Sequence, residues 1–201
     1  IDGPVGAPSI EYSNYSTVVL VAGGIGVTPF ASILKHLLHV WEQHRCPACG
    51  SVQLPKRMQL KRVHFYWVTK EQYQMDWFRD MLNQLSQLDV DGRVTIDTYL
   101  TPLGGQRQST AGPLKLIQSF MHARQDRDIF TGLQRSKMHM GRPDWKTELN
   151  KVARQTSGDG SDIGVFLCGP PALDRDVALH CRKFNTKNPT GVQFSYHSEK
   201  F

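Results

Sequence analysis

The stretch from Val18 to Phe30 constrains the fold more than any other part of this sequence. It reads Val-Val-Leu-Val-Ala-Gly-Gly-Ile-Gly-Val-Thr-Pro-Phe, an apolar strand that runs into a glycine turn and then into the start of a helix. A strand, a glycine turn and a helix in this order present backbone N–H groups to a pyrophosphate. The spacing Gly23-Gly24-x-Gly26 does not meet the G-x-G-x-x-G fingerprint of ordinary NAD dehydrogenases. We therefore predict a nucleotide-binding module with a related phosphate loop.

Composition narrows the class of protein. The 201 residues, 39% of them hydrophobic, suffice for one full core. Basic residues are scattered among acids despite the net charge of +6, so we expect a solvated surface and no nucleic-acid partner. Four cysteines form no dense disulfide framework, which favours a reducing, cytosolic setting. Because the chain starts without Met and has no apolar run of membrane-spanning length, we expect a water-soluble piece of a longer protein.

Short β-rich runs alternate with segments of helical period, which predicts an α/β fold of parallel strands and crossover helices. Five strands are expected, around 17–22, 63–68, 93–100, 163–168 and 192–196. Helices are expected around 29–41, 77–88, 114–124, 145–153 and 171–184. In the first helix the apolar residues Phe30, Ile33, Leu34, Leu37, Leu38 and Trp41 recur at helical spacing, so they predict one buried face. Residues 101–142 indicate a flexible insert.

Further motifs along the chain carry a resemblance to a known family. They are Asp2-Gly3-Pro4-Val5-Gly6, Gly24-Ile25-Gly26-Val27-Thr28-Pro29-Phe30, Phe65-Tyr66-Trp67-Val68, Asp76-Trp77-Phe78, Thr131-Gly132-Leu133, Gly141-Arg142-Pro143-Asp144-Trp145, Phe166-Leu167-Cys168-Gly169-Pro170 and the closing Phe201. In this order they resemble the cytosolic dehydrogenase region of the NADPH oxidase family over essentially the whole chain. The Cys46-Pro-Ala-Cys49 insert is similar to that of calcium-regulated members, including plant respiratory burst oxidases.

The resemblance implies electron flow from NADPH to FAD, then through membrane haems to dioxygen, which gives superoxide. It implies a ferredoxin-NADP reductase-like NADP-binding domain over 17–201, with a five-stranded parallel sheet flanked by helices. Residues 1–16 would connect this domain to a missing flavin-binding barrel. The expected partners are the FAD-binding domain and the haem-bearing transmembrane domain of the same parent chain, with a regulatory calcium-binding domain. The lobe would lie on the cytosolic side of a membrane, and alone it would be inactive.

The glycine turn is the expected pyrophosphate site. Gly23, Gly24 and Gly26 would let the backbone approach the pyrophosphate, unless they only make a tight strand-to-helix turn. Thr28 would donate its hydroxyl to a phosphate oxygen at the helix N-terminus. The remaining cofactor-binding residues of this loop are Ile25, Val27 and Pro29.

The choice between NADPH and NADH depends on the group that meets the ribose beyond the second strand. An acid there favours a 2′-hydroxyl and a cation favours a 2′-phosphate, and Lys70 stands beside Glu71. Oxidases commonly have arginine at the resembling position, so Lys70 keeps the charge but lacks the bidentate fork. Arg142 matches the family's second phosphate-binding cation. We therefore expect NADPH.

The nicotinamide end is assigned through the resemblance. Cys168-Gly169-Pro170 ends the fourth strand at the edge where α/β sheets place ligands, and the resemblance puts it beside the nicotinamide. Cys168 would shape the pocket, because no nearby residue supplies the base that a nucleophile needs. The terminal aromatic ring of Phe201 would cover the flavin as a gate. Hydride transfer itself needs no protein acid or base.

Other interpretations stay open. Cys46 and Cys49 follow His36 and His39 closely enough for a Cys2His2 zinc site, although a reduced surface loop is the preferred interpretation and no metal is expected. A redox switch at these cysteines is favoured less than either. The chain could instead be the lobe of a ferric or other flavin-dependent reductase. It could also be a non-catalytic nucleotide-sensing module that docks a partner through residues 101–142.

Overall fold

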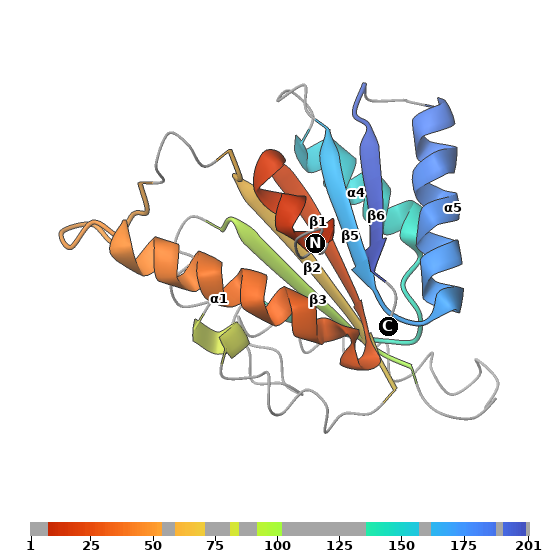
Figure 1. Cartoon of the computed structure of the whole chain (residues 1–201), viewed down its shortest axis with the longest axis horizontal. Helices are drawn as coiled ribbons and strands as arrows, with labels where there is room; N and C mark the ends of the chain where they lie inside the picture. The colour runs from red at the N-terminus through yellow and green to blue at the C-terminus, as the bar shows by residue number, and fades with distance from the viewer. Residues whose placement is uncertain are drawn as a thin grey trace, which may run out of the picture.

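A parallel six-stranded sheet forms the centre of the molecule, in the order β4-β3-β2-β1-β5-β6 (Figure 1). The computed structural model describes residues 8–53, 59–70, 81–84, 92–101, 136–156, 162–187 and 191–199. The strands are β1 (Thr17–Gly23), β2 (Arg62–Thr69), β3 (Val94–Leu100), β4 (Ser136–Met140), β5 (Ile163–Cys168) and β6 (Phe194–Glu199). The expected α/β class with a parallel sheet is confirmed.

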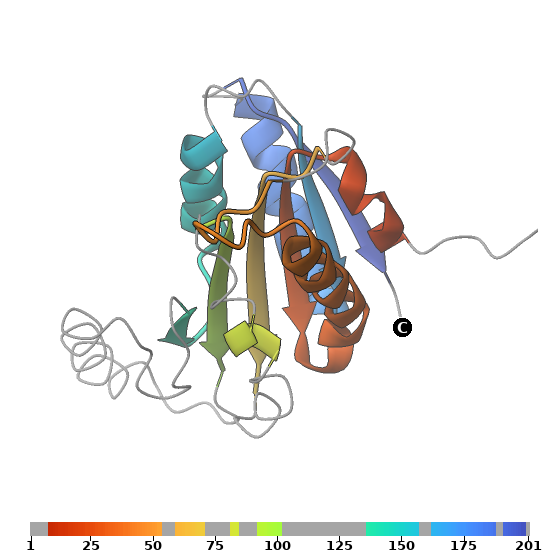
Figure 2. The same ribbon diagram turned by 90° about the vertical axis from the view of Figure 1, so that its left-hand side faces the viewer.

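Helices cover both faces of this sheet (Figures 1 and 2). They are α1 (Thr28–Gln43), α4 (Trp145–Thr156) and α5 (Pro171–Lys187), together with the short 3₁₀ helices η1 (Pro8–Asn14) and η2 (Gly24–Val27). The apolar side chains of α1 pack on one face of the sheet, and those of α4 and α5 pack on the other. None of the helices in the described ranges combines the length and apolar character that crossing a bilayer requires.

The central strand β1 is buried along its whole length because it has a helix layer on each side. Val18, Leu20 and Ala22 face the layer of α1, whereas Val19 and Val21 face α4 and α5. The predicted apolar face of the first helix is confirmed, since its six residues are all buried: Phe30, Ile33, Leu34, Leu37, Leu38 and Trp41. The helical spacing of apolar residues therefore predicted which face of α1 packs on the sheet.

The expected number of five strands was wrong, because β4 is a sixth. Its sequence Ser-Lys-Met-His-Met lacks the apolar run that identifies a strand, and its pairing with the edge of β3 creates it. The last strand was expected at 192–196 but lies at Phe194–Glu199. Pairing along the full length of β5 extends it to the polar end, where Cys168 is opposite Glu199.

Several expectations lie outside the described residues. They are the helix around 114–124, most of the helix around 77–88, most of the insert over 101–142, residues 1–7 of the connection over 1–16 and the gate at Phe201. The end of that insert is described, and it forms β4 and the turn at Gly141. Within the described segment 81–84, Met81 and Leu82 are buried in the core on the side of α1.

Candidate functional site

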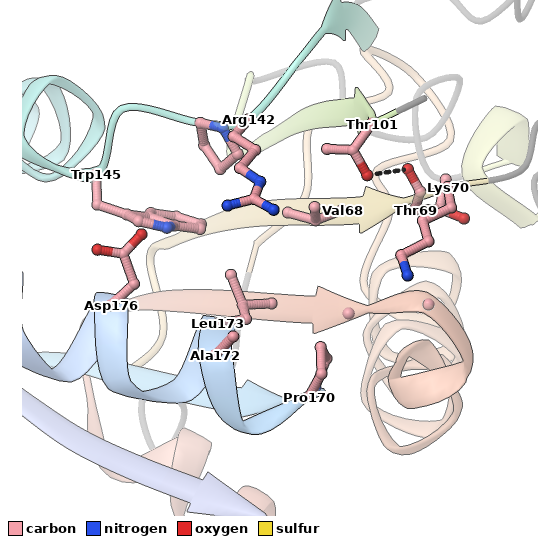
Figure 3. A pocket seen from close by; sticks show the side chains of 13 residues that line it. Val68, Thr69, Lys70, Thr101, Arg142, Trp145, Pro170, Ala172, Leu173 and Asp176 are labelled. Atoms are coloured by element: carbon pink, nitrogen blue, oxygen red, sulfur yellow. Dashed lines mark hydrogen bonds between the residues drawn. The ribbon is translucent and has the colours of Figure 1, made fainter. Parts of the chain in front are cut away.

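A cleft of about 400 Å³ lies at the carboxyl edge of the sheet (Figure 3). Its lining comes from the ends of β1, β2, β3 and β4 and from the starts of α4 and α5: Gly23, Gly24, Val68, Thr69, Lys70, Thr101, Arg142, Pro143, Trp145, Pro170, Ala172, Leu173 and Asp176. The strand that follows β1 in the sequence, β2, pairs with one edge of β1, whereas β5 pairs with its other edge. The cleft is therefore at the switch point where open α/β sheets bind ligands, and its volume is typical of a ligand pocket.

The glycine turn contacts the turn after β5. Gly24 has a φ of 55°, which a residue with a side chain rarely adopts, and its carbonyl accepts a 3.0 Å hydrogen bond from the indole N–H of Trp67. A Cβ on Gly23 would lie 2.5 Å from the ring of Pro170. A Cβ on Gly26 would lie 2.7 Å from the carbonyl carbon of Cys168. Gly23 and Gly26 are thus required for contact between the two turns, whether or not a phosphate binds there.

The other predicted residues of the phosphate loop, Ile25 and 27–29, differ in burial, and none of them lines the cleft. Ile25 is 79% exposed, whereas Val27 is fully buried in the core. The Thr28 hydroxyl donates a 2.8 Å hydrogen bond to the carbonyl of Ile25, so a bond to a phosphate would require it to rotate. Pro29 lies in the first turn of α1, where its missing N–H costs no hydrogen bond.

Two cations flank the cleft. Lys70 follows β2 and Arg142 follows β4, and Figure 3 shows their side chains on either side of Val68. Both residues are exposed, and neither forms an ion pair within the described part of the chain. Two positive charges at one cleft give it a local potential that favours an anionic ligand. The structure thus brings together the two cations that the sequence predicted.

Gly141, Asp144 and Trp145 of the Gly-Arg-Pro-Asp-Trp motif have separate structural roles. Gly141 turns the chain off β4 with a φ of 103°. The carboxylate of Asp144 then caps α4, because it accepts a 2.6 Å bond from the Thr147 hydroxyl and a 3.2 Å bond from the backbone N–H of Lys146. These bonds, led by that of Thr147, lower the pKa of Asp144. The cap fixes the segment from which Arg142 projects.

Trp145 holds the same segment in place through its buried side chain. Its side chain is 2% exposed and contacts Tyr66 edge to face, with ring centroids 5.7 Å apart. The hydroxyls of Tyr66 and Tyr99 both donate to the carboxylate of Glu148, at 3.2 and 3.1 Å. Burial, and then the charge of Glu148, raise the pKa of both phenols, so they are neutral donors. Aromatic contact and paired hydrogen bonds thus hold the start of α4 against β2 and β3.

A buried carboxylate joins β3 to β4 beside this contact. Asp97 is 1% exposed; its Oδ1 lies 2.8 Å from Nε2 of His139, and its Oδ2 lies 3.7 Å from the ammonium of Lys151. Burial raises the pKa of Asp97, but the bond to His139 and the charge of Lys151 outweigh it and keep the pKa below its ordinary value. Sequence reasoning missed this group, since its partners come from separate elements.

The turn after β5 has its side chains on two different faces. The Cys168 side chain is fully buried in the core on the side of α1, opposite the layer that covers the cleft. Burial, followed by the nearby charge of Glu199, raises the pKa of this thiol to about 11. The thiol is therefore protonated at neutral pH and is not a nucleophile. Gly169 contacts Gly23, and Pro170 lines the cleft where α5 begins.

Sequence reasoning missed other lining residues. Thr101 follows β3, and its hydroxyl donates a 3.1 Å bond to the carbonyl of Thr69. Leu173 and Asp176 come from the first turns of α5, and the Asp176 carboxylate lies 3.3 Å from the ring of His180. One signal was available, because residues that follow parallel strands share an edge with the first turn of the next helix.

Comparison with known proteins was made for the whole sequence. The family described as the ferric reductase NAD binding domain matches residues 15–182. The chain is 34% identical over 229 residues to the probable respiratory burst oxidase homolog protein I of Arabidopsis thaliana, and 34% identical over 204 residues to homolog protein D of Solanum tuberosum. The alignments cover 100% of this chain but only 24% and 23% of those relatives. The resemblance indicated by the sequence motifs is thereby confirmed.

Proposed function

Since the chain belongs to the ferric reductase NAD-binding domain family, we propose that it is the NADPH-binding lobe of a membrane NADPH oxidase. The lobe would hold NADPH at the cleft so that its nicotinamide meets an FAD. Respiratory burst oxidase homologs among the relatives support the oxidase branch. Because the chain spans about a quarter of their length, the flavin, the haems and the reduction of dioxygen to superoxide belong to the proposal.

Lys70 and Arg142, which form no ion pair with another described residue, carry this proposal. A 2′-phosphate is the group that distinguishes NADPH from NADH, and a dianion needs positive charge at its binding site. Lys70 and Arg142 provide this charge from two different strand ends of one cleft. Among the described residues that line the cleft, the only acid is Asp176, which lies beside His180. The donor set therefore fits a phosphorylated dinucleotide.

The residues of the chain would position the cofactor rather than react with it. Reduced nicotinamide supplies the hydride when NADPH is bound. The turns at Gly24 and Pro170 would contact the dinucleotide across the sheet edge, and the cations would fix its phosphorylated ribose. Rate enhancement would come from distance and angle, since no described side chain of the cleft needs to exchange a proton.

NADPH and NADH titrations of this chain, followed by chemical-shift mapping, test the proposal. Lys70→Glu and Arg142→Glu should each weaken NADPH binding about tenfold or more and leave NADH little changed, because a charge-assisted phosphate contact is lost. Lys35→Glu, an exposed lysine of α1 on the other face of the sheet, is the matched control. The absence of chemical-shift changes with both nucleotides, or an unchanged preference of the variants for NADPH over NADH, would overturn the assignment.

The remaining parts of the proposal concern the parent protein. Residues 1–16 would connect this lobe to a flavin-binding barrel, and a haem-bearing transmembrane domain would carry electrons onward from a cytosolic lobe. A calcium-binding domain would regulate it. Phe201 would cover the flavin until nicotinamide replaces it. This lobe without the FAD domain would bind NADPH weakly and transfer no electrons.

A lobe of a ferric or other flavin-dependent reductase is the second candidate, favoured by the description of the matching family. Both candidates use the same cleft and differ in the electron acceptor. Electron-acceptor assays on the full-length parent would separate them, since superoxide formation with dioxygen supports the oxidase and preferential reduction of ferric chelates supports the reductase.

A further inference from the structure

Two cysteines are brought together where α1 ends. The backbone N–H of Gly50 donates a 2.8 Å bond to the carbonyl of Cys46, and the N–H of Cys46 donates a 2.8 Å bond to the carbonyl of Ser51. A five-residue turn closed in this way is one turn of helix, in which the Cα atoms of residues three apart lie roughly 5–6 Å from each other, inside the range of about 4.4–6.8 Å that disulfides span. A bridge between Arg45 and Val52 holds the base of the turn. The turn therefore keeps the two cysteines within the Cα separation of a disulfide.

The two thiols also have unequal surroundings. Cys49 is exposed, and its Sγ lies 3.1 Å from the hydroxyl of Ser51, whereas Cys46 is half-buried. Hydrogen bonds from the Ser51 side chain and backbone, and then from the Cys46 side chain, lower the pKa of Cys49. Cys49 is therefore the better nucleophile, and Cys46 is the neighbouring thiol in contact with it.

We propose that Cys46 and Cys49 form a redox modification site whose oxidant is a hydroperoxide. The Cys49 thiolate attacks one peroxide oxygen, the O–O bond breaks, and Cys49 becomes a sulfenic acid while hydroxide leaves. The Cys46 sulfur then attacks the sulfenic sulfur, and the hydroxyl leaves as water with the Cys46 proton. In total, two thiols and one hydrogen peroxide give one disulfide and two waters.

The zinc alternative lacks ligands on the described residues. No group of three or more metal-ligating side chains forms within the ranges that the structure describes. His39 is hydrogen-bonded to the Gln43 amide at 2.9 Å, and His44 to the carbonyl of Val40 at 2.9 Å. On the described residues, the cysteine pair thus has the geometry of a dithiol.

This site is separate from the cleft. The cysteine pair follows the C-terminal end of α1, whereas the glycine turn precedes its N-terminal end. A helix of 16 residues spans about 24 Å. Oxidation of the pair therefore needs no bound dinucleotide, and the proposal does not rest on the proposed function.

Peptide mapping by mass spectrometry after treatment with hydrogen peroxide provides the test. A Cys46–Cys49 disulfide should form, with the loss of two hydrogens, and dithiothreitol should reverse it. Cys168 and Cys181 are internal controls that should stay reduced, because burial raises the pKa of their thiols to about 11 and 12. Oxidation that begins at these two, or overoxidation of Cys49 without a disulfide, would overturn the proposal.

Variants separate the two steps. Cys46→Ser should stop at a Cys49 sulfenic acid that dimedone traps, whereas Cys49→Ser should leave Cys46 several-fold less reactive toward peroxide. Ser51→Ala should slow iodoacetamide labelling of Cys49 at neutral pH several-fold, with Ser32→Ala on exposed α1 surface as control. Equal reactivity of the two single-cysteine variants would refute the assignment of Cys49 as the attacking thiol. Retention of one equivalent of added zinc through dialysis would favour a metal site instead.

Discussion

Gly26 and Cys168 meet main chain to main chain: a Cβ on Gly26 would lie 2.7 Å from the carbonyl carbon of Cys168. The two residues are far apart in sequence, yet their turns follow the adjacent strands β1 and β5. Their contact sets the relative position of the glycine turn and the start of α5. The absence of a side chain at this position is therefore a packing requirement of the cleft.

Gly26→Ala should destabilise the fold and weaken dinucleotide binding, because the backbone of Cys168 cannot yield as a flexible side chain would. We expect a loss of about 1–3 kcal/mol of unfolding free energy in chemical denaturation. Gly24→Ala is the comparison, since nothing lies within 4 Å of its Cβ and only the positive φ opposes it. Equal stability of wild type and Gly26→Ala would contradict the observed contact.

Asp144→Ala should loosen the segment that carries Arg142, because α4 loses the side chain that caps its first turn. We expect a Tm lower by about 2–4 °C and NADPH affinity several-fold weaker, with NADH affinity nearly unchanged. Asp144→Ser restores a capping oxygen and should recover both quantities. An Ala variant with wild-type NADPH affinity would show that Arg142 does not depend on this cap.

His64→Leu should change how stability depends on pH. Both ring nitrogens of His64 are buried without a hydrogen-bond partner in the described structure, and burial, then the charge of Lys151, lower its pKa to about 4. The unfolded chain takes up this proton near pH 6.5 and the folded chain only near pH 4, so stability falls as pH drops through this window. The loss approaches about 3 kcal/mol at pH 4.

Denaturation midpoints between pH 7 and 4 test this prediction, and the Leu variant should show a flatter dependence than wild type. His36→Gln changes an exposed histidine of α1 and serves as control. Identical pH profiles for wild type and His64→Leu would mean that folding leaves the pKa of His64 unchanged.

Asp97→Asn should lower stability at neutral pH, because His139 and Lys151 lose the buried charge that they share. We expect a decrease of about 1–3 kcal/mol in the free energy of unfolding. The pKa of Asp97 is depressed in the folded state, so its contribution is present above the ordinary value of 3.8 and is lost as pH falls further. Wild type and variant should therefore converge in acid, while exposed Asp162→Asn should follow wild type throughout.

Much of the site was predictable because its residues follow strands that are easy to recognise. The apolar run before Gly23 identifies β1, and the run before Lys70 identifies β2. Parallel strands place their carboxyl ends at one edge, so these residues were expected to meet. Asp97 and its partners could not be predicted in this way, since no local pattern pairs a residue of β3 with residues of β4 and α4.

The sequence by itself determined the elements whose information is local: the buried face of α1 from its helical period, and the turn at Gly24 from its lack of a side chain. Only the tertiary structure decided the rest. β4 exists because the edge of β3 offers unpaired backbone groups to a polar segment, and the face on which Cys168 lies follows from the register of β5 in the sheet. The physical reason is that backbone pairing and close packing depend on partners that are distant in the chain.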